Sequence, residues 1–226
     1  QFARIEKVIP KSEWNVLQKE AKKKGITTST LLCTAYALVL GYWSNQPELT
    51  INVTVFTRYP FNEGVTDIVG DFTSVILLRV NLLGRSDFWK LASEIQNQLM
   101  DALEHRHYDG MNVIRKIAEQ AEMKEQAVMP VVFTSLLFSM EEGDIVTIED
   151  LGEVKMGVSQ TSQVYLDYQV METKEGLLIT WDYIKELFTP NMISTMFKQY
   201  INIVESLSKN VISMPHLDSK EQEVFT

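Results

Sequence analysis

Two apolar stretches of strand character carry polar residues that a hydrophobic core does not need. Thr134 and Ser135 follow the run Val-Val-Phe, and Asp167 follows the run Val-Tyr-Leu. A carboxyl group can take up and return a proton, and a hydroxyl can orient a carbonyl oxygen or a water molecule. Polar groups in such stretches must face solvent, find a partner or line a cavity. Periodicity alone leaves these three alternatives open.

The other reactive side chains have simpler interpretations. Cys33 is the only cysteine and lies in an apolar run, so we interpret it as a core residue and expect no disulfide framework and no CxxC metal site. His105 and His107 would need further ligands to hold zinc, and the sequence does not cluster any with them. We interpret these two histidines as structural or helix-terminal residues.

The composition limits the class of protein. With 226 residues, 45% hydrophobic and 23% charged, the chain can bury a sizeable core in one domain or one large lobe. Its 21 basic and 30 acidic residues give a net charge of -9, and such a negative field argues against a nucleic-acid partner. The apolar run at residues 31–43 is shorter than the roughly 20 residues that span a bilayer, and no signal-peptide pattern opens the chain. We therefore expect no membrane partner and a cytoplasmic location.

Hydrophobic periodicity predicts helices mixed with strands. The helix expected from residue 28 to 43 is apolar on nearly all sides, which indicates burial, and the strand at residues 72–80 is expected to be covered on both faces. Residues 208–226 turn polar and irregular, as is typical of a linker to a following domain. The elements as predicted are strands at 4–9, 49–56, 72–80, 129–138, 163–171 and 177–182, with helices beginning near Ser12, Thr28, Ser86, Asp109 and Pro190.

These elements indicate an α/β fold class, a layered mixed sheet with helices. A hairpin is expected only between the last two strands, through residues 173–176. The other strands must then be joined by longer connections, several of which contain helices.

Four segments occur in the order of a known set of motifs. They read GDFTSVILL at residues 70–78, PVVFTS at 130–135, SQTSQVYLD at 159–167, and Trp181-Asp182 after a gap of thirteen residues. This set resembles the signature motifs GDFTxLxLL, PVVFTS, SQTPQVxLD and WD of the heterocyclization (Cy) domains of non-ribosomal peptide synthetases, a branch of the condensation-domain family. Four ordered motifs across most of the chain make a specific signal.

The resemblance implies an architecture and a set of partners. It implies that residues 1–207 are the C-terminal lobe of the two-lobed chloramphenicol-acetyltransferase-like (condensation domain) fold, with 208–226 as the linker. The implied partners are the N-terminal lobe of the same domain, peptidyl carrier protein domains upstream and downstream, and an adjacent adenylation domain. No metal or directly bound cofactor is implied, because the 4'-phosphopantetheine arm belongs to the carrier proteins.

The resemblance also implies a reaction and roles for residues. Cy domains condense a carrier-bound acyl or peptidyl thioester with carrier-bound Cys, Ser or Thr, then cyclise and dehydrate the product to a thiazoline or oxazoline. Asp167 matches the position of the acid/base carboxyl and Thr134 that of the orienting hydroxyl, with Ser135 as a weaker candidate and Gln160 and Gln163 as possible supporting residues. Without the resemblance, Thr134 would be read as a strand residue bonded to backbone, and Asp167 as a solvent-facing acid.

This chain departs from the family pattern at two positions. Thr57 stands where the family has Asn in LFNR, and Ser162 stands where it has Pro. A hydroxyl offers fewer hydrogen-bonding groups than an amide, so Thr57, a further possible supporting residue, bears on the efficiency of the amide-forming step.

Two other functions compete with cyclodehydration. A non-catalytic module that docks carrier proteins or an adenylation domain would share the fold, and Thr57 together with the missing lobe favours it. A plain condensing acyltransferase would have no dehydration to catalyse, and Thr134 with Asp167 argues against it. We expect the isolated lobe to fold but not to turn over.

Overall fold

A six-stranded mixed sheet carries the fold in the computed structural model, which describes residues 1–58, 63–84, 86–120, 127–137, 157, 159 and 161–209. The strand order is β1-β6-β5-β4-β2-β3. Strand β4 runs parallel to both of its neighbours, β2 and β5, whereas the other pairs are antiparallel. The strands are β1 (Phe2–Pro10), β2 (Glu48–Phe56), β3 (Thr73–Asn81), β4 (Val131–Ser135), β5 (Leu166–Glu172) and β6 (Gly176–Ile184).

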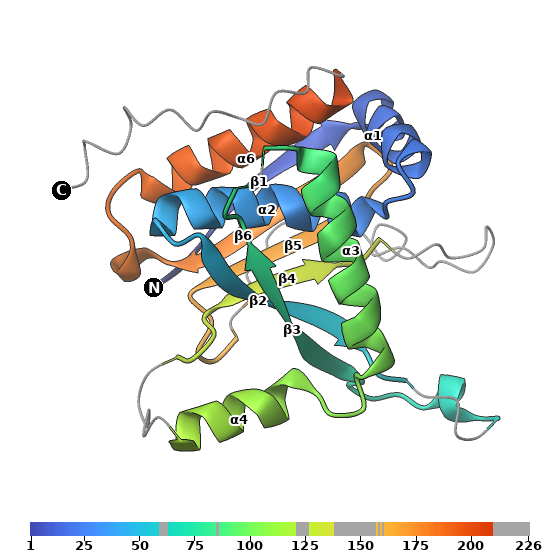
Figure 1. Ribbon diagram of the computed structural model, residues 1–226, viewed down its shortest axis with the longest axis vertical. Coiled ribbons are helices and arrows are strands. Elements are labelled where there is room, and N and C mark those ends of the chain that lie inside the picture. The colour runs from blue at the N-terminus through green and yellow to red at the C-terminus, as the bar shows by residue number, and fades with distance from the viewer. Residues whose placement is uncertain are drawn as a thin grey trace.

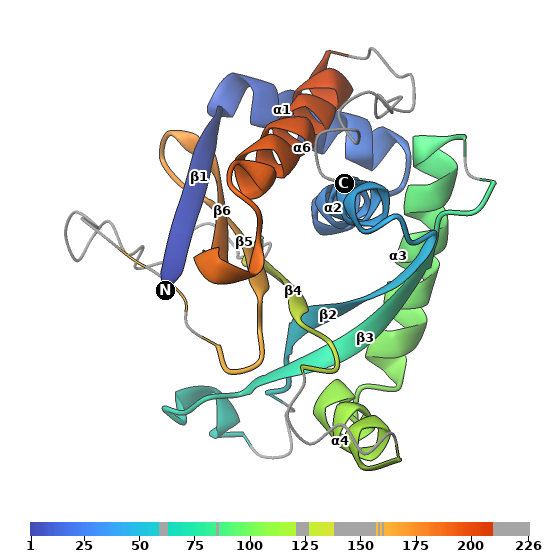
Figure 2. The same ribbon diagram turned by 90° about the vertical axis from the view of Figure 1, so that its left-hand side faces the viewer.

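Four helices gather on one side of this sheet (Figures 1 and 2). They are α1 (Lys11–Lys23), α2 (Thr28–Ser44), α3 (Phe88–Glu104) and α6 (Met192–Ser208), and α2 contacts each of the other three. The helix α4 (Gly110–Gln120) lies apart from them and packs against β3. Two short 3-10 helices, Val65–Asp67 and Lys185–Leu187, complete the described elements.

Helix α2 is the centre of the helical layer. The Thr27 hydroxyl caps it by accepting a hydrogen bond from the Thr30 amide at 3.2 Å, and Asn45 ends it in the left-handed conformation with φ 50°. Almost every residue from Thr30 to Val39 is buried, which confirms the buried helix predicted from its apolar composition. Among the described residues no single helix has the length and apolarity to cross a membrane. The pair α1 and α2 passes that test only jointly, across a bend of 98°.

An aromatic cluster joins α2 and α6 to the sheet. The rings of Phe133 and Tyr168 stack with centroids 4.7 Å apart, and Tyr36 approaches Trp181 edge-on at 5.3 Å. Tyr200 of α6 completes the cluster through the Tyr168 hydroxyl, at an O···O distance of 2.7 Å. All five side chains are essentially inaccessible to solvent. Because side chains alternate along a strand, the neighbours of these aromatic residues must point to the opposite face.

Several predicted boundaries are wrong. Helix α1 begins at Lys11 with Pro10 at its N-cap and no side-chain cap, so Ser12 is not the cap. Helix α6 begins at Met192 after Asn191, two residues beyond the predicted Thr189-Pro190 start, because Asn191 adopts a left-handed conformation with φ 67°.

The sheet also differs from the prediction in detail. Strand β4 ends at Ser135 within the predicted span 129–138. Strand β3 is not covered throughout on both faces: Ile76, Leu78 and Val80 are buried, but Arg79 on the other face is exposed. Helix α4 covers only part of that face, where Gly110 lies so close to Val75 that an added Cβ would come within 2.8 Å of the Val75 carbonyl oxygen. The predicted linker at residues 208–226 stays a prediction, because residues 210–226 lie outside the described part.

Candidate functional site

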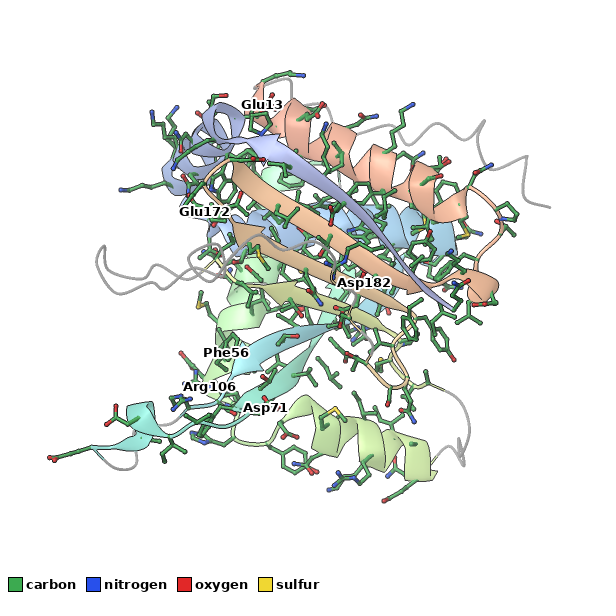
Figure 3. All side chains as sticks on the ribbon, turned by 180° about the vertical axis from the view of Figure 1, so that it is seen from behind. Glu13, Phe56, Asp71, Arg106, Glu172 and Asp182 are labelled. Carbon is green, nitrogen blue, oxygen red and sulfur yellow. The ribbon has the colours of Figure 1, made fainter. Side chains whose placement is uncertain are left out.

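Polar side chains of neighbouring strands lie in a line on the sheet face opposite the helices, and one of them, Asp182, is labelled in Figure 3. The strand register places Asp167 of β5 beside Val132 of β4 and Asp182 of β6, and it places Arg4 of β1 beside Asp182. One step further along, Gln169 lies beside Thr134 and Thr180. Thr54 of β2 is hydrogen-bonded to Thr134 and extends this line by one strand. We call six residues of this face the polar row: Arg4, Asp182, Asp167, Gln169, Thr134 and Thr54.

Asp182 and Arg4 form a bidentate ion pair at one end of the polar row. Arg4 Nε donates to Oδ1 at 2.8 Å and Nη2 to Oδ2 at 2.7 Å, while the Ser159 amide also donates to Oδ2 at 2.7 Å. The Asp182 side chain is 1% exposed and that of Arg4 is 22% exposed. The hydrogen bond to Asp182 raises the pKa of Arg4. Asp182 is therefore a buried salt-bridge acid.

Asp167 lies in the middle of the polar row and is only 6% exposed. Its Oδ2 accepts a hydrogen bond from Gln169 Nε2 at 3.0 Å, but its buried Oδ1 has no hydrogen-bond partner among the described residues. Burial raises the pKa of Asp167 because it disfavours the charged form, and the nearby Asp182 adds to this. The hydrogen bond from Gln169, the proximity of the polar Ser159 side chain and the charge of Arg4 act in the opposite direction without cancelling it.

Thr134 shares this face with Asp167. It lies two residues beyond Val132, the neighbour of Asp167, which separates the two Cα atoms by about 8 Å for strands ~4.8 Å apart that rise ~3.3 Å per residue. Gln169, the direct neighbour of Thr134, bridges part of this distance through its bond to Asp167. The Thr134 hydroxyl is hydrogen-bonded to the Thr54 hydroxyl at 2.8 Å. The structure thus brings the two principal predicted residues to one surface.

The other predicted site residues lie elsewhere. Ser135 points to the helical side, where its hydroxyl is hydrogen-bonded to that of Ser29 at 2.7 Å. The Thr57 hydroxyl donates to the Phe72 carbonyl at 2.9 Å, just beyond the end of β2. Gln163 is exposed in a turn before β5 with φ 63°, and Gln160 lies outside the described residues.

The sequence interpretation missed three members of the polar row. Gln169 could have been found, because a residue two positions after Asp167 on the same strand must share its face. Arg4 and Thr54 could not, since their places depend on how β1 pairs with β6 and on how β2 meets β4. Neither pairing is encoded in a local motif.

No cluster of three or more His, Cys, Asp or Glu side chains that could hold a metal occurs within the described ranges. Cys33 is fully buried, and burial raises the pKa of its thiol to about 12, so it is an inert core residue as interpreted. His105 ends helix α3, and its Nδ1 lies 2.8 Å from the Asp101 carbonyl oxygen. The polar row itself offers two carboxyl groups, a guanidinium, an amide and two hydroxyl groups.

Comparison with known proteins shows the family to which the chain belongs. The family model of the condensation domain matches residues 3–222. Bacitracin synthase 1 of Bacillus licheniformis is 41% identical over 215 residues, which make up 94% of this chain and 4% of that protein. Phenyloxazoline synthase MbtB of Mycobacterium tuberculosis is 35% identical over 191 residues, or 83% of this chain and 13% of that protein.

A solved structure shows the same architecture. The cyclization-docking bidomain of the non-ribosomal peptide synthetase EpoB from Sorangium cellulosum superimposes with a TM-score of 0.81 at 30% identity, covering 92% of this chain and 42% of that one. The chain thus spans a small part of the curated relatives that it matches and less than half of the solved one. It has the chloramphenicol-acetyltransferase-like fold, and it belongs to the condensation domain family of non-ribosomal peptide synthetases.

Proposed function

We propose that this chain is part of a heterocyclization domain. The domain would condense a carrier-bound acyl or peptidyl thioester with carrier-bound Cys, Ser or Thr, and would then cyclodehydrate the product to a thiazoline or oxazoline. The names of two relatives support this proposal, one being a phenyloxazoline synthase and the other a cyclization bidomain. The four ordered sequence motifs support it independently.

The observation that carries the proposal is the state of the Asp167 carboxyl. Buried polar atoms in native proteins are almost always hydrogen-bonded, yet Oδ1 of Asp167 has no hydrogen-bond partner in the described part of the chain. Its raised pKa makes the protonated form accessible closer to neutral pH. A carboxyl in this state can both accept and donate a proton, which is what an acid/base catalyst must do.

The proton transfers can be assigned to this group. As the thiol or hydroxyl of the carrier-bound residue attacks the amide carbonyl carbon, the Asp167 carboxylate takes its proton and passes it to the carbonyl oxygen, giving a hydroxyl on the new ring. The Asp167 carboxylate then takes the proton of the ring nitrogen and delivers it to this hydroxyl, which leaves as water while the C=N bond forms. The carboxylate is thereby regenerated.

Thr134 would orient the oxygen that leaves. Its hydroxyl is held by Thr54 at 2.8 Å, so its direction is fixed before the substrate arrives. Gln169 would hold Asp167 through Oδ2 and leave Oδ1 for the reaction. The Arg4–Asp182 pair lies beside Asp167, where the charge of Arg4 would favour the carboxylate form and that of Asp182 the protonated form.

Partners follow from the chemistry of the substrates. Both substrates would arrive as thioesters on the 4'-phosphopantetheine arms of peptidyl carrier protein domains, with an adenylation domain supplying the amino acid. A second lobe would close over the polar row, so we expect this lobe alone not to turn over. Because the Thr57 hydroxyl is bonded to the Phe72 carbonyl, we assign Thr57 to the local backbone rather than to proton transfer.

The test is turnover by the complete two-lobed domain with loaded carrier proteins, scored by mass for the loss of one water. Asp167→Asn should slow cyclisation by roughly 10²- to 10⁴-fold while uncyclised amide accumulates. Thr134→Val should have a smaller effect of the same kind. Glu172→Gln, an exposed change on the same strand, is the control and should leave the rate unchanged.

Cyclisation by Asp167→Asn at a rate close to wild type would disprove the acid/base assignment. A wild-type domain that binds carrier proteins but forms neither amide nor ring would instead indicate the non-catalytic docking module.

A further inference from the structure

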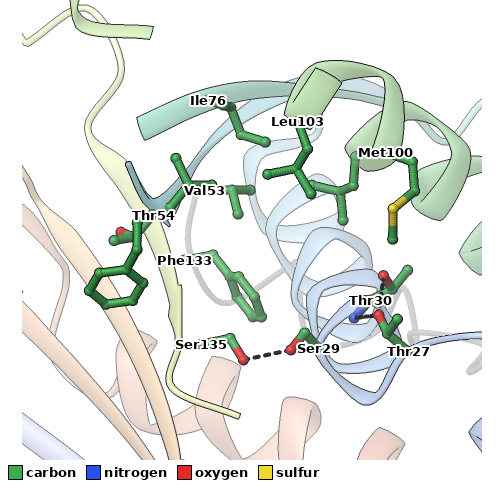
Figure 4. Close-up of a pocket in the computed structure, with 13 residues that line it drawn as sticks. Thr27, Ser29, Thr30, Val53, Thr54, Ile76, Met100, Leu103, Phe133 and Ser135 are labelled. Atoms are coloured by element: carbon green, nitrogen blue, oxygen red, sulfur yellow. Dashed lines mark hydrogen bonds between the residues drawn. The ribbon is translucent and has the colours of Figure 1, made fainter. Parts of the chain in front are cut away.

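A pocket of about 310 Å³ lies on the helical side of the sheet, at the carboxyl ends of the parallel strands β2 and β4 (Figure 4). The start of α2 and the second half of α3 form its other walls. Most of its lining is apolar, as with Val53, Ile76, Leu103 and Phe133, and none of the described residues that line it is charged. The carboxyl ends of parallel strands are a common place for ligands in sheets of this kind.

The pocket lies beside a split in the sheet, the point where β2 and β4 stop pairing. The two strands are paired at only two positions, Asn52 with Val132 and Val53 with Phe133. The residues from Val53 to Phe56, which begin at the last paired position of β2, all line the pocket. The pocket therefore lies against β2 where its pairing with β4 ends.

This split lies beside the hydroxyl assigned to catalysis. The hydrogen bond between Thr54 and Thr134 joins the two strands just past their last paired position. Phe133 and Ser135, the two neighbours of Thr134, both line the pocket. A group held in the pocket would thus lie within one residue of Thr134, around the edge of the same strand.

The hydroxyl groups at the start of α2 and at the end of β4 are already hydrogen-bonded within the protein, so they do not require a polar ligand. The hydroxyls of Ser29 and Ser135 are hydrogen-bonded to each other at 2.7 Å, and those of Thr27 and Thr30 likewise at 2.7 Å. The ligand that suits such a lining is apolar. At the mouth, Met100 and Phe56 are each 46% exposed, which offers apolar contact to an entering group.

We propose that this pocket binds the apolar substituent of the upstream acyl group and selects the donor substrate. The naming of this ligand rests on the proposed function. In that reaction the Cys, Ser or Thr side chain is the nucleophile and must stay at the polar row. The acyl group is then the substrate whose apolar substituent can enter the pocket. At about 30 Å³ for each water-sized group, the pocket holds roughly ten non-hydrogen atoms, the size of a branched aliphatic chain or one aromatic ring.

The experiment is a binding titration of the 226-residue chain without turnover. The probes are the N-acetylcysteamine thioesters of 4-methylpentanoic acid and of acetic acid, followed through the methyl signals of ¹³C-labelled methionines. The branched probe should bind at least about tenfold more tightly than the acetyl probe. It should shift the methyl signal of Met100 and leave that of Met111, an equally exposed methionine on α4, in place.

Two matched variants complete the test. Met100→Trp should fill the mouth and remove most of the difference between the two probes, whereas Met111→Trp should preserve it. Equal affinity for both probes would overturn the proposal, as would a Met100 signal that does not move in the wild-type chain. The latter measurement does not depend on the variants folding. Since no reaction is scored, a failure of the Asp167 assignment would leave these results untouched, and the reverse also holds.

Discussion

The two faces of the sheet are built from the same strands and are held together in different ways. Toward the helices, Phe133, Tyr168 and Trp181 pack in an aromatic cluster in which each ring touches several others. On the opposite face, the adjacent residues Thr134, Asp167 and Asp182 are held by a few hydrogen bonds, each to one or two specific partners. Adjacent residues of one strand therefore belong to two different environments: a densely packed aromatic cluster on one face and specific hydrogen-bonded pairs on the other.

This contrast explains what each face can tolerate. Dispersion and burial on the helical side are spread over many contacts, so the stability of that face does not depend on any single directional interaction. On the polar row, the loss of one partner leaves a buried charge or hydroxyl without compensation. The helical face therefore supplies most of the stability. The polar row provides the reactive groups, and their burial lowers stability.

The largest expected effect is on the helical face. Trp181→Ala should lower the free energy of unfolding by about 3–5 kcal/mol, because it removes a fully buried indole from the centre of the aromatic cluster. Urea denaturation followed by far-UV circular dichroism measures this. Tyr108→Ala, at an exposed aromatic residue, is the control and should change stability by less than about 1 kcal/mol. Similar losses for both variants would show that the cluster is not the principal support of the fold.

The polar row should come next. Asp182→Ala should cost about 3 kcal/mol, since it leaves the partly buried Arg4 guanidinium and the Ser159 amide without their acceptor. The double variant Arg4→Met with Asp182→Leu should recover much of the loss, because no charge is then left unpaired. If the double variant is less stable than Asp182→Ala alone, the ion pair stabilises the fold by more than the mutual neutralisation of its two charges.

Asp167 should show an effect that depends on pH. Its pKa is raised in the folded state, so folding is favoured below the unfolded value of about 3.9 and is weakened as pH rises through the folded pKa. Asp167→Asn removes this penalty and should be more stable than wild type at neutral pH, by about 1.4 kcal/mol per pKa unit of the shift. The difference should shrink as the solution is acidified toward pH 4. Thermal melts across this range check it, and a difference that does not vary with pH would contradict the raised pKa.

The smallest effect concerns hydroxyl groups within the helical face. Tyr168→Phe should cost about 1 kcal/mol, because it leaves the buried Tyr200 hydroxyl without the partner it has at 2.7 Å. Tyr36→Phe is the matched control: its buried hydroxyl has no hydrogen-bond partner among the described residues, so its removal should be neutral or stabilising. Equal losses at both positions, measured by urea denaturation, would show that removal of the hydroxyl group itself, and not the loss of its hydrogen bond, sets the value.

Much of the fold could be predicted because it follows from local pattern. The apolar periodicity of β2, α2 and α3 indicated these elements to within a few residues. The caps were less predictable, because several residue types can satisfy the same helix end. At α6, the Thr189-Pro190 pair has the chemistry of a helix start, yet it forms a turn in which the Met192 amide donates to the Thr189 carbonyl, and Asn191 takes the capping position.

The candidate site was predictable only in part, for a geometric reason. That Thr134 and Asp167 share a face depends on the parallel register of β4 and β5, whose paired residues are 35 positions apart along the chain. The motif resemblance put Thr134 and Asp167 first, but it kept Ser135 as a weaker candidate and Thr57 as a possible supporting residue. Only the pleat, which turns Ser135 toward Ser29, and the local bond of Thr57 to Phe72 separate them.

The pairing of β1 with β6 has a consequence for synthesis on the ribosome. Its register joins Phe2 to Ile184, so β1 has to remain without its neighbour until the residues as far as β6 have been translated. Exposed strand edges during such a wait invite pairing with other nascent chains. The charges of Arg4, Glu6 and Lys7, with Pro10 at the end, oppose that pairing. Arg4, at one end of the polar row, would thus also lower the tendency of the incompletely translated chain to aggregate.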